Sequence, residues 1–198
     1  LLETVHAGTA PSLNLTGSDA AETMVSGNNN DTLLGMGGND ALYSWAGSDV
    51  IAGGSGVDYL CDGDGSDTII GGSGNDSIQS GMWDEQLQQY VHDGDSDSFF
   101  VGDGIDSIWG ADDTDYLVVN FLVSSIEYFF DGVDLTVYFN RDISAPLHEA
   151  IRVVIHEAYD GIFGLTLEDG DLSSSPFGFL GNVINFNYQD LVTDFDYL

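Results

Sequence analysis

Acidic residues recur at intervals of nine through the first part of the sequence. The series runs through Glu22, Asp31, Asp40, Asp49, Asp58, Asp67 and Asp76, and it resumes at Asp97, Asp106 and Asp115. Carboxylate oxygens are hard ligands, and Ca²⁺ takes about six to eight oxygens at about 2.3–2.6 Å. Carboxylates repeated at a constant interval therefore predict a row of calcium sites.

The chain carries almost no positive charge to balance these acids. Its 198 residues include 34 Asp and Glu but only 2 Lys and Arg, which gives a formal net charge of −32. Self-repulsion of this size disfavours a compact state unless cations bind. Nucleic acids and anionic membranes need basic patches, so neither is expected as a partner. An acidic surface that only maintains solubility is the alternative, and the regular spacing argues against it.

Each acid has two regular neighbours. An apolar residue follows it by two positions, at Met24, Leu33, Leu42, Ile51, Leu60, Ile69, Ile78, Phe99, Ile108 and Leu117, with Leu15 one step earlier. A glycine precedes the acid by two positions at Gly38, Gly47, Gly56, Gly65, Gly74 and Gly104, whereas Asn29, Asp95 and Asp113 depart from this pattern.

A repeat of nine residues fits a short strand followed by a tight turn better than one face of a helix. Two repeats make one coil of 18 residues, in which the apolar residue of each strand points inward. The predicted inward stacks are Leu33–Ile51–Ile69 and Leu42–Leu60–Ile78. Strands of successive coils, about 4.8 Å apart, would form two parallel sheets. This predicts an all-β fold whose glycine turns take positive φ and point carbonyl oxygens into the gaps between coils.

Acids that lie 18 residues apart fall at neighbouring turns. A Ca²⁺ between two such turns would take both carboxylates together with backbone carbonyl oxygens from the repeat glycines. The predicted pairs are Glu22–Asp40, Asp31–Asp49, Asp40–Asp58, Asp49–Asp67, Asp58–Asp76 and Asp97–Asp115, with Asp106 in the same series, which amounts to roughly six ions. Because each strand supplies one inward aliphatic residue, folding is predicted to depend on the metal.

Two segments come close to an ideal nonapeptide. "GGSGVDYLC" at 53–61 and "GGSGNDSIQ" at 71–79 resemble the RTX repeat, whose form is Gly-Gly-x-Gly-x-Asp-x-aliphatic-x. The resemblance covers residues 17–118 and implies a parallel β-roll that binds Ca²⁺. It also implies a secreted, extracellular protein that passes through type I secretion machinery, guided by an uncleaved C-terminal signal, and folds once outside the cell.

Three places depart from the repeat. Glu22 replaces aspartate, and Trp45 stands where the second glycine belongs, so the sites beside those turns are expected to be weak or empty. Asp76 and Asp97 are 21 residues apart, and residues 80–94 lack the repeat glycines. We expect an insertion that bulges from one turn, with a short helical piece at 84–90. The spacing leaves open whether the roll continues or a second small roll begins.

The repeat pattern divides the chain into three parts. Residues 1–16 are predicted to form an N-terminal strand that leads into and caps the roll, and residues 17–118 form the roll itself. Residues 119–198 are predicted to form a β-rich C-terminal cap that includes a type I secretion signal. A cap is needed because the end of a solenoid exposes apolar core and unpaired strand edges.

Alternating apolar residues in the last part predict two hairpins. The first joins 125–130 to 133–139 around Asp131-Gly132, and the second joins 151–155 to 163–167. The acidic and aromatic tail at 177–198 resembles RTX secretion signals. A last strand or helix that packs on the cap is the alternative interpretation of this tail.

The sequence contains no convincing catalytic motif. A zinc-protease helix needs His-Glu-x-x-His, but Arg152 lies four residues after His148, and His156 follows in an alternating, strand-like segment. Both histidines are therefore predicted to be surface residues of a strand, and the chain is predicted not to be an enzyme. A compact enzyme is the third and least favoured hypothesis.

Two functional hypotheses remain. The first is a non-catalytic extracellular structural module that folds on Ca²⁺, either free-standing or as a surface-layer or filament subunit, with homo-oligomers formed through its ends. Repeats and cap account for nearly the whole chain, which favours it. The second is the C-terminal secretion and folding module of a larger secreted enzyme, toxin or adhesin. The absence of an initial Met and the degenerate repeats from Leu15 favour this second hypothesis.

Overall fold

The computed structural model describes residues 3–4, 11–84, 89–91, 94–112, 114–119, 125–130, 134–140, 151–156 and 182–183. All regular secondary structure within these ranges consists of β-strands. The first sheet has the order β1 (Glu3–Thr4), β3 (Thr23–Val25), β5 (Ala41–Ala46), β7 (Tyr59–Asp64), β9 (Ser77–Gln79), β13 (Ile105–Trp109), β17 (Ile151–Ile155), β16 (Leu135–Asn140) and β15 (Ser125–Phe130). The second sheet has the order β18 (Asn182–Val183), β14 (Tyr116–Val119), β12 (Ser98–Val101), β8 (Thr68–Ser73), β6 (Val50–Ser55), β4 (Thr32–Gly37) and β2 (Asn14–Thr16).

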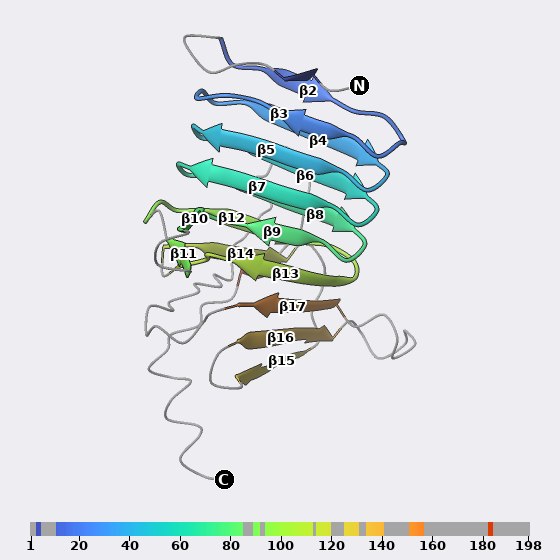
Figure 1. The fold of residues 1–198 in the computed structure, drawn as a ribbon. Helices are drawn as coiled ribbons and strands as arrows, with labels where there is room; N and C mark the ends of the chain where they lie inside the picture. Colours follow the sequence, from blue (N-terminus) through green and yellow to red (C-terminus); the bar gives the residue numbers. More distant parts are fainter. Residues whose placement is uncertain are drawn as a thin grey trace, which may run out of the picture.

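The chain changes sheet at each strand of the roll, so one coil contains one strand from each sheet. Neighbouring strands are parallel and are offset by one coil: Leu33 lies opposite Ile51, and Leu42 lies opposite Leu60. Figure 1 shows the coils as two facing layers that run from the blue N-terminal strands to the green middle of the chain. The predicted all-β, parallel β-roll with about 18 residues per coil is confirmed.

The core consists of the apolar residues that point between the two sheets. The buried members of the repeat series are Met24, Leu33, Leu42, Ile51, Leu60, Ile69, Ile78, Phe99, Ile108 and Leu117, as predicted. Leu15, in the first coil, is only half-buried. Burying one aliphatic side chain stabilises a fold by about 1.5–3 kcal/mol. One such residue per strand makes a thin core, so the turns contribute strongly to stability.

The roll continues through the insertion. Ile69 of β8 lies opposite Phe99 of β12, and Ile78 of β9 lies opposite Ile108 of β13. The offset is 30 residues there instead of 18. The additional residues leave the turn between β9 and β12 and contain β10 (Met82–Asp84) and β11 (Gln89–Val91), which pair antiparallel. A second, separate roll is thus ruled out for the described residues.

The predicted helical piece at 84–90 is wrong where the structure describes it. Asp84 ends β10, and Gln89 and Tyr90 belong to β11. A seven-residue helix is too short to be stable by itself. The two short segments instead satisfy their backbone groups by pairing with each other.

The first sheet extends beyond the last coil of the roll. β15 and β16 form the predicted antiparallel hairpin, with Phe130 opposite Leu135. β17 pairs antiparallel with β16 and parallel with β13, and it buries Val153 and Ile155. The predicted strand at 163–167 and most of the tail lie outside the described residues. No helix in the described part of the chain could cross a lipid bilayer.

Candidate metal centre

The nine aspartates of the series, called here the ladder aspartates, are all buried and connect successive coils. Up to Asp97, the backbone N–H of each acid in the series donates to Oδ1 of the acid one coil later, as from Asp40 to Asp58 at 2.8 Å and from Asp58 to Asp76 at 3.0 Å. The same bond joins Glu22 to Asp40, Asp31 to Asp49, Asp49 to Asp67 and Asp97 to Asp115. All six predicted pairs are therefore neighbours in space.

Two further pairs of ladder aspartates cross the insertion. The N–H of Asp67 donates to Oδ1 of Asp97 at 2.8 Å, and that of Asp76 donates to Oδ1 of Asp106 at 3.0 Å. The sequence did not predict these pairs, because the spacing alone did not show on which side of the roll the ladder resumes.

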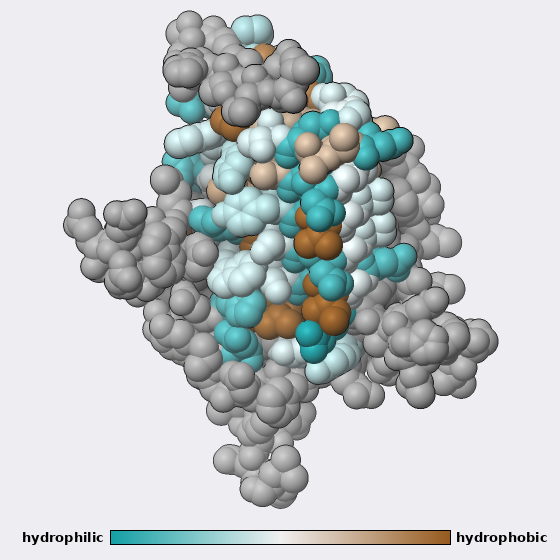
Figure 2. Space-filling view, turned by 45° about the vertical axis from the view of Figure 1, so that its right-hand side comes forward, coloured by the Kyte–Doolittle hydropathy of each residue, from teal (hydrophilic) through white to brown (hydrophobic). Residues whose placement is uncertain are grey.

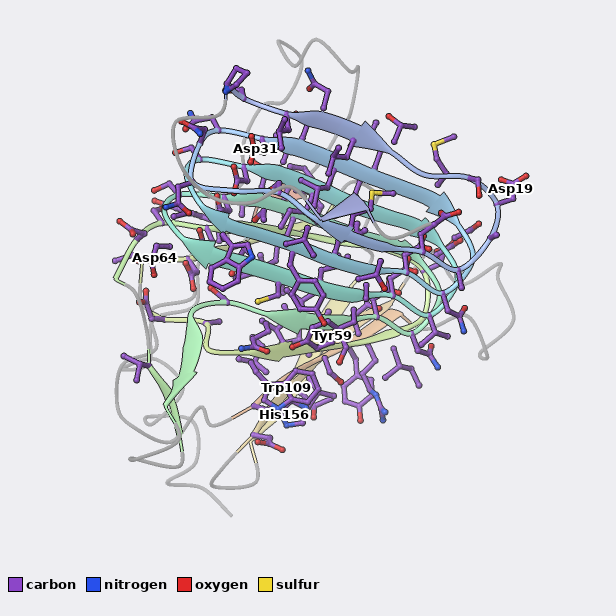
Figure 3. All side chains as sticks on the ribbon, turned by 45° about the horizontal axis from the view of Figure 1, so that its top comes forward. Asp19, Asp31, Tyr59, Asp64, Trp109 and His156 are labelled. Carbon is purple, nitrogen blue, oxygen red and sulfur yellow. The ribbon has the colours of Figure 1, made fainter. Side chains whose placement is uncertain are left out.

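The turns form two rows, on opposite edges of the roll. Turns 17–22, 35–40, 53–58 and 71–76 lead into the first sheet and begin with Gly17, Gly35, Gly53 and Gly71, so we call them the glycine row. Turns 26–31, 44–49, 62–67 and 80–97 lead into the second sheet and begin with Ser26, Ser44, Asp62 and Ser80, so we call them the serine row. In Figure 3, Asp19 marks the first edge, and Asp31 and Asp64 mark the other.

The glycine row contains carboxylate oxygens without partners. Oδ2 of Asp40, Asp58 and Asp76 is fully buried and accepts no hydrogen bond among the described residues. Burying a charged oxygen without a hydrogen bond or a counter-ion is strongly unfavourable. These three oxygens therefore require a partner that the protein itself does not supply.

Backbone oxygens converge on the same places. A methyl group on Gly35 would lie 2.5 Å from Oδ2 of Asp40 and 2.4 Å from the carbonyl oxygen of Gly53. At Gly53 the corresponding distances are 2.4 Å to Oδ2 of Asp58 and 2.7 Å to the carbonyl oxygen of Gly71. Gly35 and Gly53 thus each open a cradle lined by a carboxylate oxygen and a carbonyl oxygen from the next coil, and Gly71 opens one beside Oδ2 of Asp76, 2.6 Å from a methyl group there.

The repeat glycines add a second set of carbonyl oxygens. Gly38, Gly56 and Gly74 have φ of 108°, 138° and 138°, as predicted for this turn position. The carbonyl oxygen of Gly38 faces the α-carbon of Gly56, and that of Gly56 faces Gly74, so close that a methyl group there would lie 1.6 and 1.5 Å away. Gly47, Gly65 and Gly104 also have positive φ. Carbonyl oxygens therefore point into the gaps between coils.

Side chains also connect the turns along their outer rim. Oδ1 of Asn39 accepts the backbone N–H of Val57 at 2.9 Å, and Oδ1 of Asn75 accepts that of Ile105 at 2.9 Å. Figure 2 turns the edge of the glycine row forward and shows hydrophobic and hydrophilic residues alternating along it. The exposed hydrophobic side chains of this rim include Val57 and Ile105.

Burial raises the pKa of the ladder aspartates in the glycine row. Desolvation is the main cause at Asp40, Asp58 and Asp76, and the N–H bond from the preceding coil only partly opposes it. Repulsion by the preceding acid raises these pKa values further. The pKa of Asp76 rises to about 6 and that of Asp106 to about 7. Holding these groups ionised therefore costs free energy in the absence of a cation.

The residues present fit Ca²⁺. Carboxylate and carbonyl oxygens are the ligands that Ca²⁺ prefers, and both kinds converge beside Gly35 and Gly53. A divalent cation would offset the repulsion between stacked carboxylates and occupy the unpartnered side of Asp40 and Asp58. The carboxylates of the glycine row, with nearby carbonyl oxygens, would hold the ion.

A cluster that the sequence did not reveal lies in the serine row. One ligand atom each of Asp62, Asp67 and Asp97 lies within 4.8 Å of the others, and all three residues are buried. Asp62 occupies the first position of its turn, where the repeat usually has glycine. An acidic residue at that position was the one sign in the sequence that Asp62 could join a cluster. Asp97 lies beside it only because the offset between coils is 30 residues there.

The two departures within the repeats have distinct local effects. The carboxylate of Glu22 turns to Ser18, whose backbone N–H donates to Oε2 at 3.0 Å and whose hydroxyl donates to Oε1, so the pKa of Glu22 is lowered. Trp45 keeps the positive φ of the glycine it replaces, at 75°, with its side chain 56% exposed. Met36 does the same at 78°. The turn geometry therefore survives both large residues.

His156 joins the last coil to the strands beyond it. Its ring stacks on Trp109 with centroids 4.3 Å apart, and its Nδ1 lies 3.0 Å from Oδ2 of Asp134. Figure 3 shows the two rings side by side. These contacts link β13, β17 and the start of β16, so His156 has a structural role. His148 lies outside the described residues.

A family model matches four stretches of the chain, and comparison with solved structures finds ten similar chains. The model for the RTX calcium-binding nonapeptide repeat matches residues 16–51, 25–60, 62–82 and 93–120. The repeat region belongs to the RTX calcium-binding family. The matches leave out 83–92, which is most of the insertion. The RTX repeats account for the all-β coils, and their type binds Ca²⁺.

The solution structure of the AlgE6R3 subunit from the Azotobacter vinelandii mannuronan C5-epimerase is similar to this RTX chain with a TM-score of 0.43 and 21% sequence identity. The alignment covers 76% of this chain and 80% of that one. The comparison with curated protein sequences found no match.

Proposed function

We propose that this RTX chain is a non-catalytic extracellular structural module whose β-roll folds when it binds Ca²⁺ after export. The observation that carries the proposal is the set of buried, unpartnered oxygens on Asp40, Asp58 and Asp76, each beside an open glycine cradle. Water solvates these carboxylates in the unfolded chain, and burial removes that water. Calcium replaces it, so the binding free energy becomes folding free energy.

The charge of the chain supports folding outside the cell. A net charge of −32 opposes compaction wherever free Ca²⁺ is scarce. A chain that stays unfolded in such a compartment remains able to pass through a secretion channel. Export by type I machinery and a location at the cell surface follow from the RTX resemblance.

One end of the roll offers a surface for self-association. β2 begins the second sheet, and its flanking side chains Asn14 and Thr16 are exposed. The first strand of a sheet presents backbone groups on its outer side that can pair with another chain. Association of this end with the opposite end of another copy would extend into the filament or surface layer that the structural role needs.

Far-UV circular dichroism of the metal-free chain during titration with Ca²⁺ tests this function, with Mg²⁺ as the control and light scattering recorded in parallel. We expect a cooperative change from coil to sheet with Ca²⁺ alone, followed by a rise in scattering. A sheet spectrum already complete in chelator would overturn calcium-dependent folding. Folding without any rise in scattering would overturn self-assembly and favour a folding module of a larger secreted protein.

A further inference from the structure

The two rows of turns differ at one position, and we infer that this difference decides where Ca²⁺ binds. Calcium occupies the gaps of the glycine row, whereas the hydroxyls of Ser26 and Ser44 take its place in the corresponding gaps of the serine row. The inference rests on the proposed calcium-dependent folding, because it assigns the ions to particular gaps. It removes Asp31–Asp49 and Asp49–Asp67 from the pairs that the spacing alone predicts.

The first residue of each turn faces the carbonyl oxygen of its counterpart in the next coil. In the glycine row, a methyl group on Gly17 would lie 2.6 Å from the carbonyl oxygen of Gly35, and one on Gly35 would lie 2.4 Å from that of Gly53. At Gly35 the side-chain atoms nearest to this space belong to the Asp40 carboxylate, whereas at Gly17 the Cε of Met24 also lies 2.6 Å away. The carbonyl oxygen of Gly53 therefore remains available to a cation.

In the serine row a hydroxyl occupies the equivalent space. The Ser26 hydroxyl donates to the carbonyl oxygen of Ser44 at 2.9 Å, and the Ser44 hydroxyl donates to that of Asp62 at 2.6 Å. Both serine side chains are buried, with exposures of 2% and 0%. At these distances each hydroxyl makes a hydrogen bond to the carbonyl oxygen. A cation in the same gap would have to break that bond and push the hydroxyl aside.

The second carboxylate oxygens differ between the rows at some of the acids. Those of Asp40, Asp58 and Asp76 in the glycine row accept no hydrogen bond among the described residues. In the serine row, Oδ2 of Asp31 accepts the N–H of Gly27 at 3.1 Å, and Oδ2 of Asp97 accepts the Ser80 hydroxyl at 2.8 Å. The protein itself therefore satisfies Oδ2 of Asp31 and Asp97 in the serine row, whereas the corresponding oxygens of the glycine row need a cation.

Asp49 is intermediate between these cases. Burial raises the pKa of its carboxyl, while the nearby Ser44 hydroxyl acts to lower it. Its Oδ2 has no hydrogen bond of normal geometry among the described residues. Removing the Ser44 hydroxyl would leave this oxygen beside an empty cradle, as in the glycine row. The third turn of the serine row begins with Asp62 instead of serine. The variants below therefore change Ser26 and Ser44.

An exchange of residue types between the rows tests the inference. We expect Ser44→Gly to bind one more Ca²⁺ per chain than the unchanged protein, because it opens a cradle beside Asp49. We expect Gly53→Ser to bind one fewer, because its hydroxyl would fill the cradle beside Asp58. Gly53 does not have positive φ, but a Cβ there would lie 2.4 Å from Oδ2 of Asp58 and 2.7 Å from the carbonyl oxygen of Gly71, so the turn must shift to accept serine. Native mass spectrometry at saturating Ca²⁺ counts the ions, and circular dichroism confirms that each variant folds.

The controls change the same residue types away from the cradles. Ser55→Gly alters an exposed serine, and Gly27→Ser adds a side chain where nothing lies within 4 Å. Both should keep the original count. Ser26→Gly repeats the gain at the neighbouring gap, so the test does not depend on one variant. An unchanged count in the folded Ser44→Gly and Ser26→Gly proteins would overturn the inference alone. If the protein without substitutions binds no Ca²⁺, the proposed function is overturned as well.

Discussion

The backbone N–H of Asp40 donates to Oδ1 of Asp58 at 2.8 Å, and Oδ2 of the same carboxylate lies beside Gly53, where the carbonyl oxygen of Gly71 also points. One carboxylate thus contacts the preceding coil directly and shares a gap with the following coil. The ladder aspartates therefore connect coils in two ways, one made by the protein alone and one that needs a cation.

Replacing Asp58 with Ala should damage two neighbouring calcium sites. The change removes the acceptor for the Asp40 N–H, a bond to a charged group that contributes about 1.5–3 kcal/mol. It also removes the carboxylate from the gaps on either side. We expect fewer bound Ca²⁺ ions and a lower melting temperature, measured by isothermal titration calorimetry and thermal circular dichroism. Asp64→Ala, which removes an exposed acid of the serine row, should change neither. Unchanged stoichiometry and melting in Asp58→Ala would show that the pairing across one coil does not bind calcium.

Replacing Ile51 with Ala should strongly destabilise the calcium-loaded roll. Ile51 is fully buried between the two sheets, and truncating such a residue costs about 2–5 kcal/mol. The thin core has few other contacts to compensate for the cavity. Val50→Ala is the matched control, because Val50 is the adjacent residue and is 37% exposed; it should cost less than about 1 kcal/mol. Denaturant unfolding in saturating Ca²⁺ measures both, and equal effects would argue against the inward stack.

Replacing Gly63 with Ala should disturb the close approach of two coils. Gly63 has φ of 97°, and a methyl group there would lie 1.6 Å from the carbonyl oxygen of Trp45. The left-handed backbone alone costs a non-glycine residue about 1–2 kcal/mol, and the clash with backbone adds to it. Gly27→Ala meets nothing within 4 Å and should be nearly neutral. A melting temperature in Ca²⁺ that is the same for both variants would contradict the close packing of these turns.

Lowering the pH should promote folding of the metal-free chain. Burial raises the pKa values of Asp76, Asp106 and Asp115 to about 6, 7 and 8, above the ordinary 3.8. The folded roll therefore binds more protons than the unfolded chain, and its stability is lost as pH rises through these values. In chelator we expect more sheet signal at pH 5.5 than at pH 8.

Saturating Ca²⁺ should reverse this pH dependence, because protons then compete with the metal for the same carboxylates. Thermal melts at both pH values, with and without Ca²⁺, compare the two conditions. A metal-free chain with more sheet at pH 8 than at pH 5.5 would contradict the assigned direction of these pKa shifts.

The periodic part of the fold could be predicted because one residue type repeats at each structural position. Leu33, Leu42 and Ile51 identified the inward face, and their positions fixed the strand, the turn and the coil length together. The hairpin of β15 and β16 was also predictable, since apolar alternation on both sides of Asp131-Gly132 is a local signal.

The path through the insertion depends on contacts that spacing does not specify. Asp97 lies beside Asp67 only because the extra residues fold outward as β10 and β11. The difference between the two rows was equally hidden. Ser44 and Asp62 look like ordinary deviations from the repeat until the structure shows which carbonyl oxygen each one faces.

Amide hydrogen exchange of the segment from β5 to β8, measured by mass spectrometry in chelator and in Ca²⁺, tests calcium-dependent folding most directly. These strands contain the cradles beside Gly53 and Gly71 and the ladder from Asp40 to Asp76. We expect rapid exchange throughout the segment in chelator and strong protection once Ca²⁺ is added. Strong protection in chelator, unchanged by Ca²⁺, would contradict it and would mean that the roll folds without its cations.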